Sequence, residues 1–177
     1  SRWEPGQTIA DLFRSLPADT AYVRASLSAD QGGQPVRWGQ AAIFQVRRAD
    51  IAAISHPLGI TLGNEITLLG YDLMGTTPIS LTLYWQPVRL PQRDYTTFVH
   101  LLDANGQMVR QKDSPPLDNL YPTSAWRLGD VIRDTFIIPV QQPPAEIRLG
   151  LYNLATMQRL ARQEGPDYIS IPLTTAP

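Results

Sequence analysis

Short runs in which apolar and polar residues alternate make up most of the chain, and they predict β-strands. In one run Leu81, Leu83 and Trp85 fall on one face of the predicted strand, whereas Thr82 and Tyr84 fall on the other. The strands predicted in this way cover residues 65–73, 79–86, 95–102, 107–112, 131–138, 146–152 and 168–173, with a short strand near 158–160. The pattern therefore favours an all-β protein.

Turn-forming residues separate the predicted strands. The chain contains 16 Pro and 12 Gly, and residues 103–106 read Asp-Ala-Asn-Gly, which suits a hairpin turn. The longest irregular stretch is 113–128, and His56 is assigned to a loop because Pro57 follows it. Seven or eight antiparallel strands with such spacing predict a β-sandwich, either Ig-like or jelly-roll-like.

The chain also contains an internal similarity that predicts a repeat. Trp3, Gly6, Ile9, Asp11 and Phe13 recur as Trp126, Gly129, Ile132, Asp134 and Phe136, 123 positions further on. The similarity continues, with small shifts, between 21–27 and 145–151 and between 43–46 and 168–171. We therefore interpret 1–48 as the β-rich second half of a preceding unit, and 49–177 as a complete β-sandwich domain.

A half-unit of this length buries too little surface to fold alone. Its apolar content is too high for a disordered tail. We expect it either to dock on the complete unit of its own chain or to form a homodimer through residues 1–48. Because the chain starts abruptly within sequence that has the pattern of structure, and residues 1–10 do not resemble a secretory signal, we expect it to be a fragment of a longer protein.

Composition and charge exclude several classes of function. The net charge is −1 and the pI is about 6.1, so a nucleic-acid partner is not expected. The absence of Cys excludes disulfides, thiolate metal sites and a cysteine nucleophile. No apolar run approaches the roughly 20 residues that a membrane-spanning helix requires.

Sequence motifs for catalysis and for cofactor binding are missing as well. The chain has no Gly-x-Ser-x-Gly elbow, no phosphate-binding glycine motif, and only two His without metal-ligand spacing. His100, between Val99 and Leu101, is interpreted as a residue of the sheet rather than as a catalyst. We therefore expect no catalytic residues, no metal and no cofactor.

Oxygen-bearing side chains gather near one hairpin and the loop that follows it. Asp103, Asn105 and Asp113 flank the hairpin, and Asp118 and Asn119 lie in the loop. Such oxygens could hold Ca²⁺, but Asp and Asn also bond to their own backbone in turns, and turn formation is the favoured interpretation.

An acid on the apolar face of a strand must find hydrogen-bond donors. Asp134 shares such a face with Ile132 and Phe136, and Asp11 stands at the equivalent position of the predicted half-unit. Because the acid recurs in both copies, Asp134 is predicted to anchor a neighbouring turn by hydrogen bonding.

Aromatic residues are the candidates for sugar binding, because the apolar faces of pyranoses stack on flat rings. Tyr121 is expected to be exposed because it lies in a polar loop. We take Asp118, Asn119, Tyr121 and Trp126 as the candidate ligand-binding residues, although edge or corner packing is the favoured interpretation of Trp126. Other aromatic candidates, assigned mainly to the core, are Tyr84, Tyr95 and Tyr152.

Four segments together resemble a known kind of domain: Leu81–Trp85 (LTLYW), 94–103 (DYTTFVHLLD), 121–126 (YPTSAW) and 150–152 (GLY). They are similar to the extracytoplasmic β-sandwich domains of large bacterial membrane proteins of the dolichyl-phosphate-mannose-mannosyltransferase-like type. The resemblance covers about 59–173. It implies a location outside the cytoplasmic membrane, tethered to a parent protein that handles lipid-linked sugars, with sugar transfer carried out by a membrane portion that is absent here.

The resulting functional hypothesis is a non-catalytic extracytoplasmic accessory domain of a membrane-anchored glycosyltransferase-like protein. One alternative is a carbohydrate-binding module for cell-surface glycans. Another is a structural spacer or a protein-interaction module whose partner is a cell-envelope protein.

Overall fold

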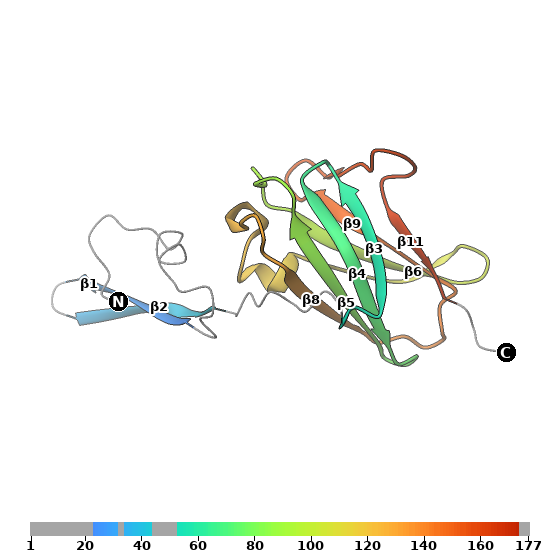
Figure 1. Cartoon of the computed structure of the whole chain (residues 1–177). Helices are drawn as coiled ribbons and strands as arrows, with labels where there is room; N and C mark the ends of the chain where they lie inside the picture. Colours follow the sequence, from blue (N-terminus) through green and yellow to red (C-terminus); the bar gives the residue numbers. More distant parts are fainter. Residues whose placement is uncertain (1–22, 32–33, 44–52, 174–177) are drawn as a thin grey trace. The chain divides into compact units, whose positions relative to one another are not determined.

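A computed structural model describes residues 23–31, 34–43 and 53–173 (Figure 1). The chain divides into two compact units, Ser1–Arg47 and Arg48–Pro177. In the first unit, β1 (Val23–Gln31) and β2 (Gln34–Ile43) form an antiparallel hairpin. Trp3 and Asp11 lie outside the described residues, so the repeat, the docking of 1–48 and the homodimer remain predictions.

The second unit consists of two antiparallel sheets, as the all-β sandwich prediction requires (Figure 1). One sheet has the order β3-β4-β5-β8, and the other has the order β10-β9-β6-β7 with β11 also paired to β9. The strands are β3 (His56–Leu62), β4 (Ile66–Met74), β5 (Ile79–Pro87), β6 (Thr96–Leu102), β7 (Met108–Ser114), β8 (Ile132–Ile138), β9 (Glu146–Asn153), β10 (Gln158–Arg159) and β11 (Ile169–Pro172). Two short 3₁₀ helices, η2 (Pro116–Asn119) and η3 (Thr123–Ala125), interrupt the connection between β7 and β8.

The sequence prediction missed β3. His56 was assigned to a loop, but it is the first residue of this strand and pairs with Tyr71 of β4. Pro57 and Gly59 hide the strand pattern, and the β3–β4 register shifts between Pro57 and Ile60. An edge strand tolerates this because one of its sides needs no ladder hydrogen bonds.

The core lies between the two sheets, and the predicted face of β5 is confirmed. Leu81, Leu83 and Trp85 are fully buried against the other sheet. On the outer face, the Thr82 hydroxyl lies 3.0 Å from that of Thr135. The Tyr84 hydroxyl donates a hydrogen bond to Asp72 at 2.6 Å. The alternation of β5 therefore separates a dry core from a hydrogen-bonded outer layer.

The prediction that Asp134 anchors a turn is confirmed. Its side chain is buried on the inner face of β8, between Ile132 and Phe136. Its Oδ1 accepts a hydrogen bond of 3.1 Å from the backbone N–H of Leu117 in η2. Oδ2 is buried without a hydrogen-bond partner among the described residues. The carboxyl group thus holds η2 against the sheet at the expense of one unsatisfied oxygen.

The strand directions give this unit two distinct ends. Because Trp85 pairs with Ile132 and Thr96 pairs with Tyr152, the end of β5 lies beside the start of β8, and the end of β9 beside the start of β6. We call this the loop end. The opposite end, which we call the pocket end, holds the start of β3 and the ends of β4 and β11.

Candidate functional site

Two of the four predicted ligand-binding residues are buried. Tyr121 is 6% exposed and Trp126 is 1% exposed, so the expectation of an exposed Tyr121 is wrong. The Tyr121 hydroxyl lies 2.7 Å from Asp130 Oδ2 and 3.0 Å from the Ala125 carbonyl, and burial raises the pKa of this hydroxyl. Trp126 Nε1 donates to the Tyr121 carbonyl at 2.9 Å. The loop folds around its own aromatic rings because it supplies the polar partners they need.

The other two predicted residues, Asp118 and Asn119, are exposed in η2. Asp118 Oδ1 accepts a hydrogen bond of 2.8 Å from the Ser114 hydroxyl. Both residues have positive φ, which Asp and Asn tolerate better than most side chains. Since the rings of Tyr121 and Trp126 are buried, the four residues do not form an aromatic platform with polar neighbours. Ligand binding by Asp118 and Asn119 stays a prediction.

Turn formation accounts for the carboxylate of Asp103 in the β6–β7 hairpin. Asp103 Oδ1 accepts hydrogen bonds from the backbone N–H groups of Asn105 (2.9 Å) and Gln107 (2.8 Å). This is the turn chemistry that the sequence favoured. Within residues 23–31, 34–43 and 53–173, no three His, Cys, Asp or Glu side chains group in a way that could hold a metal ion.

His100 lies in β6 as predicted and belongs to the outer face of its sheet. Its ring centroid is 5.0 Å from that of Phe98, at an interplanar angle of 46°. Burial lowers the pKa of His100, so the ring is kept neutral against the sheet. The interpretation as a sheet residue is confirmed by this position.

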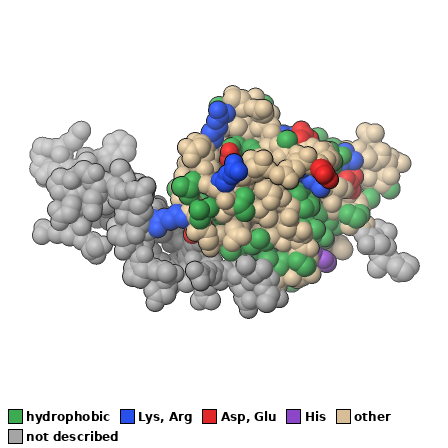
Figure 2. Space-filling model, turned by 45° about the horizontal axis from the view of Figure 1, so that its top comes forward, with side chains coloured by type: hydrophobic (Ala, Val, Ile, Leu, Met, Phe, Trp, Pro, Cys, Tyr) green, Lys and Arg blue, Asp and Glu red, His purple; other side chains and the backbone are tan. Residues whose placement is uncertain are grey.

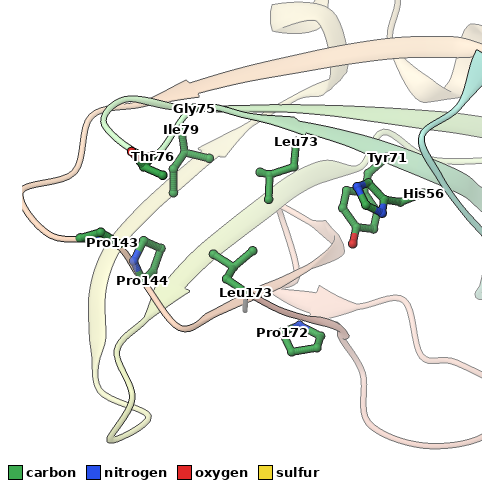
Figure 3. A pocket seen from close by; sticks show the side chains of 10 residues that line it. All are labelled: His56, Tyr71, Leu73, Gly75, Thr76, Ile79, Pro143, Pro144, Pro172 and Leu173. Carbon is green, nitrogen blue, oxygen red and sulfur yellow. The ribbon is translucent and has the colours of Figure 1, made fainter. Parts of the chain in front are cut away.

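A pocket at the pocket end is the strongest candidate site (Figure 3). Its volume is about 550 Å³, which is within the usual size of small-molecule sites. The lining residues are His56, Tyr71, Leu73, Gly75, Thr76, Ile79, Pro143, Pro144, Pro172 and Leu173. In Figure 3, Leu73 and Ile79 point into the pocket from β4 and β5, and Pro172 and Leu173 lie across from them.

The pocket forms where the inner face of β4 is not fully covered. Tyr71 pairs with Leu83, and Leu73 pairs with Leu81, so both point toward the other sheet. Their partners on β5 are fully buried, but Tyr71 and Leu73 themselves are only half-buried. The sandwich is therefore open along this edge, and inward-facing side chains reach solvent there.

A stacked pair of rings forms one wall of the pocket. The centroids of His56 and Tyr71 are 4.6 Å apart, and the ring planes differ by 12°. The pair arises because the two residues face each other across β3 and β4. At Gly70, next to Tyr71, a Cβ atom would collide with the His56 carbonyl oxygen, so the bare backbone of glycine allows the strands to approach this closely.

The lining defines the chemistry of a ligand that would fit. Its described residues include no Asp, Glu, Lys or Arg, and their polar side chains are those of His56, Tyr71 and Thr76. Burial raises the pKa of Tyr71, so its hydroxyl stays protonated and available as a donor. A flat ring wall with a few hydrogen-bonding groups and without carboxylate, ammonium or guanidinium groups among its described residues suits an uncharged ligand that has one apolar face.

Sequence reasoning missed both residues of this wall. Tyr71 was placed in a strand but not among the aromatic candidates, and His56 was placed in a loop. The missing signal is the β3–β4 register, which brings the two rings together.

Comparisons with family models, curated proteins and solved structures find no match to this chain. Among the described residues, none belongs to a helix with the length and hydropathy that crossing a bilayer requires.

Proposed function

We propose that residues 49–177 form a non-catalytic carbohydrate-binding module that takes an uncharged sugar in the pocket at His56 and Tyr71. The observation that supports this most directly is the stacked ring pair in a lining without charged side chains. A pyranose presents an apolar C–H face and a rim of hydroxyls, which matches a flat ring wall flanked by the Tyr71 and Thr76 hydroxyls.

The sequence resemblance supplies the proposed setting. It supports an accessory domain on the extracytoplasmic side of a membrane-anchored glycosyltransferase-like protein, with the sugar-transfer chemistry in the membrane portion. A sugar-binding module suits such a parent protein because it would hold a glycan near the transfer site. The proposal assigns no catalytic residue to the chain.

The second candidate is a spacer or a protein-interaction module. Burial of Tyr84, Tyr95, Tyr121 and Tyr152 favours it, because buried aromatic rings leave few platforms for glycans. Sugar binding in the pocket distinguishes the two candidates, because only the carbohydrate-binding module requires it.

Binding of neutral oligosaccharides is expected to be weak, near millimolar Kd or about −4 kcal/mol, because a site this open buries little ligand surface. Titration of the full chain with a panel of neutral oligosaccharides, followed by amide NMR shifts, is expected to move the signals of β3 and β4 around His56 and Tyr71. Tyr71→Ala is expected to weaken binding at least about tenfold, because it removes the stacking face.

Tyr168→Ala is the matched control. Tyr168 is also a half-buried tyrosine, but its ring lies under Arg148, with the guanidinium carbon 5.0 Å from the ring centroid, and it does not line the pocket. It should leave sugar binding unchanged. No response across the panel would overturn the proposal in favour of the spacer, and shifts confined to 113–128 would move the site back to Asp118 and Asn119.

A further inference from the structure

Exposed aliphatic side chains gather at the loop end of the sandwich, far along the strands from the pocket. They are Val88, Leu90, Leu128, Leu154 and Met157, and their exposed fractions run from 45% to 68%. Single exposed aliphatic residues are ordinary on a protein surface. Five of them at one end of a sandwich are typical of a surface that binds another molecule.

Hydrogen bonds hold the three segments that carry these side chains together. Residues 88–94 lie between β5 and β6, 127–130 precede β8, and 153–157 begin at the last residue of β9. Asn153 Nδ2 donates to the Asp94 carbonyl at 3.2 Å, which joins the first segment to the third. The backbone N–H of Ser124 donates to Asp94 Oδ1 at 3.1 Å, which joins the first segment to the η3 region before 127–130. The three segments therefore lie together at one end of the sandwich (Figure 1).

Hydrogen bonds support the turns that carry these side chains. Asp130 Oδ2 accepts from the Arg127 backbone N–H at 2.8 Å and lies 2.7 Å from the Tyr121 hydroxyl. The Glu65 carbonyl accepts from the backbone N–H groups of Val88 (2.8 Å) and Arg89 (3.2 Å). The turns at 88–89 and 127–130 are thus hydrogen-bonded while the aliphatic tips are exposed.

The acids and the arginines at this end differ in their partners. The Asp94 carboxylate accepts from the backbone N–H of Ser124 in the η3 region, and the Asp130 carboxylate accepts from the backbone N–H of Arg127 in its own loop. In contrast, the side chains of Arg89, Arg93 and Arg127 form no ion pair with any described residue. Arg89 lies between Val88 and Leu90, and Arg127 directly precedes Leu128. Arginine residues therefore neighbour the aliphatic tips along the chain, while the carboxylates of Asp94 and Asp130 accept hydrogen bonds from backbone N–H groups.

We propose that the loop end docks on an anionic lipid surface. The aliphatic tips would enter the headgroup region, and Arg89, Arg93 and Arg127 would pair with lipid phosphates, since apolar burial and attraction to anionic lipids together determine binding of this kind. Isolated arginines beside leucines on separate turns suit a plane of phosphates better than a shaped protein pocket. The inference does not depend on sugar binding, and it would direct the pocket end away from the bilayer.

Hydrophobic and charged side chains are interspersed on the face of the molecule shown in Figure 2. A control variant for the loop end must therefore also replace exposed hydrophobic side chains by Asp, at another place on the surface. The test is sedimentation of the full chain with vesicles of phosphatidylcholine alone, and with vesicles of equal parts phosphatidylcholine and phosphatidylglycerol. The double variant Leu128→Asp/Leu154→Asp is compared with Met74→Asp/Met108→Asp. Both control methionines are more than half exposed and lie at the pocket end.

Wild type is expected to sediment with the anionic vesicles, and the loop-end variant to lose at least about tenfold in partitioning, while the methionine control keeps it. Replacing Arg89 and Arg127 by Gln should cost about fivefold for each charge, whereas Arg110→Gln on β7 should cost little. Circular dichroism confirms that each variant is folded. Failure of wild type to bind anionic vesicles, equal loss in the methionine control, or binding that ignores the arginines would each overturn the proposal.

Discussion

Trp126→Ala is expected to lower the free energy of unfolding by about 3–5 kcal/mol, the usual loss for removing a buried tryptophan. The side chain is 1% exposed, so its removal leaves a cavity beneath the turn that precedes β8. It also removes the hydrogen bond from Nε1 to the Tyr121 carbonyl, which adds to the loss of stability. The measurement is chemical denaturation of the full chain followed by circular dichroism.

Trp126→Phe serves as the graded control, because it keeps most of the ring but not the indole donor. It should lose clearly less stability than Trp126→Ala. A loss below about 1 kcal/mol in the alanine variant, accompanied by loss of sugar binding, would contradict the structural role and return Trp126 to the ligand site.

The second large effect concerns Asp134. Desolvation is the main cause that raises the pKa of this buried carboxyl from 3.8 to about 6. The hydrogen bond from Leu117 lowers the pKa, the charge of Asp118 raises it, and the charge of Lys112 lowers it. The folded state therefore holds the proton more tightly than the unfolded state. Stability linked to this group is present below about pH 4 and is lost as the pH rises toward and through 6. The total difference is up to about 3 kcal/mol.

Asp134→Asn removes this titration and nearly preserves the shape of the side chain. The difference in unfolding free energy between wild type and variant is expected to shift by up to about 3 kcal/mol in favour of the variant between pH 4 and pH 7. Comparing the two proteins cancels opposite contributions from Asp72 and Glu146, whose lowered pKa values favour the folded state at higher pH. Parallel stability profiles for the two proteins would show that Asp134 is ionised in the folded state across this range.

The alternation of apolar and polar residues was sufficient to predict most of the second unit. The apolar face of β5 and the hairpin at Asp103 were readable because period-two alternation and Asx-Gly turns are local properties of the chain. Asp134 was readable for a similar reason, since an acid between Ile132 and Phe136 must find a donor. The donor itself, Leu117, could not be identified from local pattern.

Which of the predicted site residues are exposed depends on contacts between segments that are separated in the sequence. Tyr121 follows Asp118, Asn119 and Leu120 in a polar stretch, yet Asp130 and Ala125 supply partners that allow its hydroxyl to be buried. Whether a loop tyrosine is exposed depends on whether the rest of the loop folds over its ring and supplies hydrogen-bond partners. The residue types in the loop do not determine this by themselves.

The sequence by itself determined that residues 49–177 form strands with one apolar face, because alternation requires such a face to be covered. Only the tertiary structure shows which part of the apolar face of each sheet is left uncovered by the other sheet. The pairing of His56 with Tyr71 and the incomplete cover over β4 open the pocket, and the common direction of β5 and β9 brings Leu90 and Leu154 to one end. The physical reason is that strand register and sheet packing depend on residues far apart in the sequence, whereas the alternation that defines a strand depends on neighbouring residues.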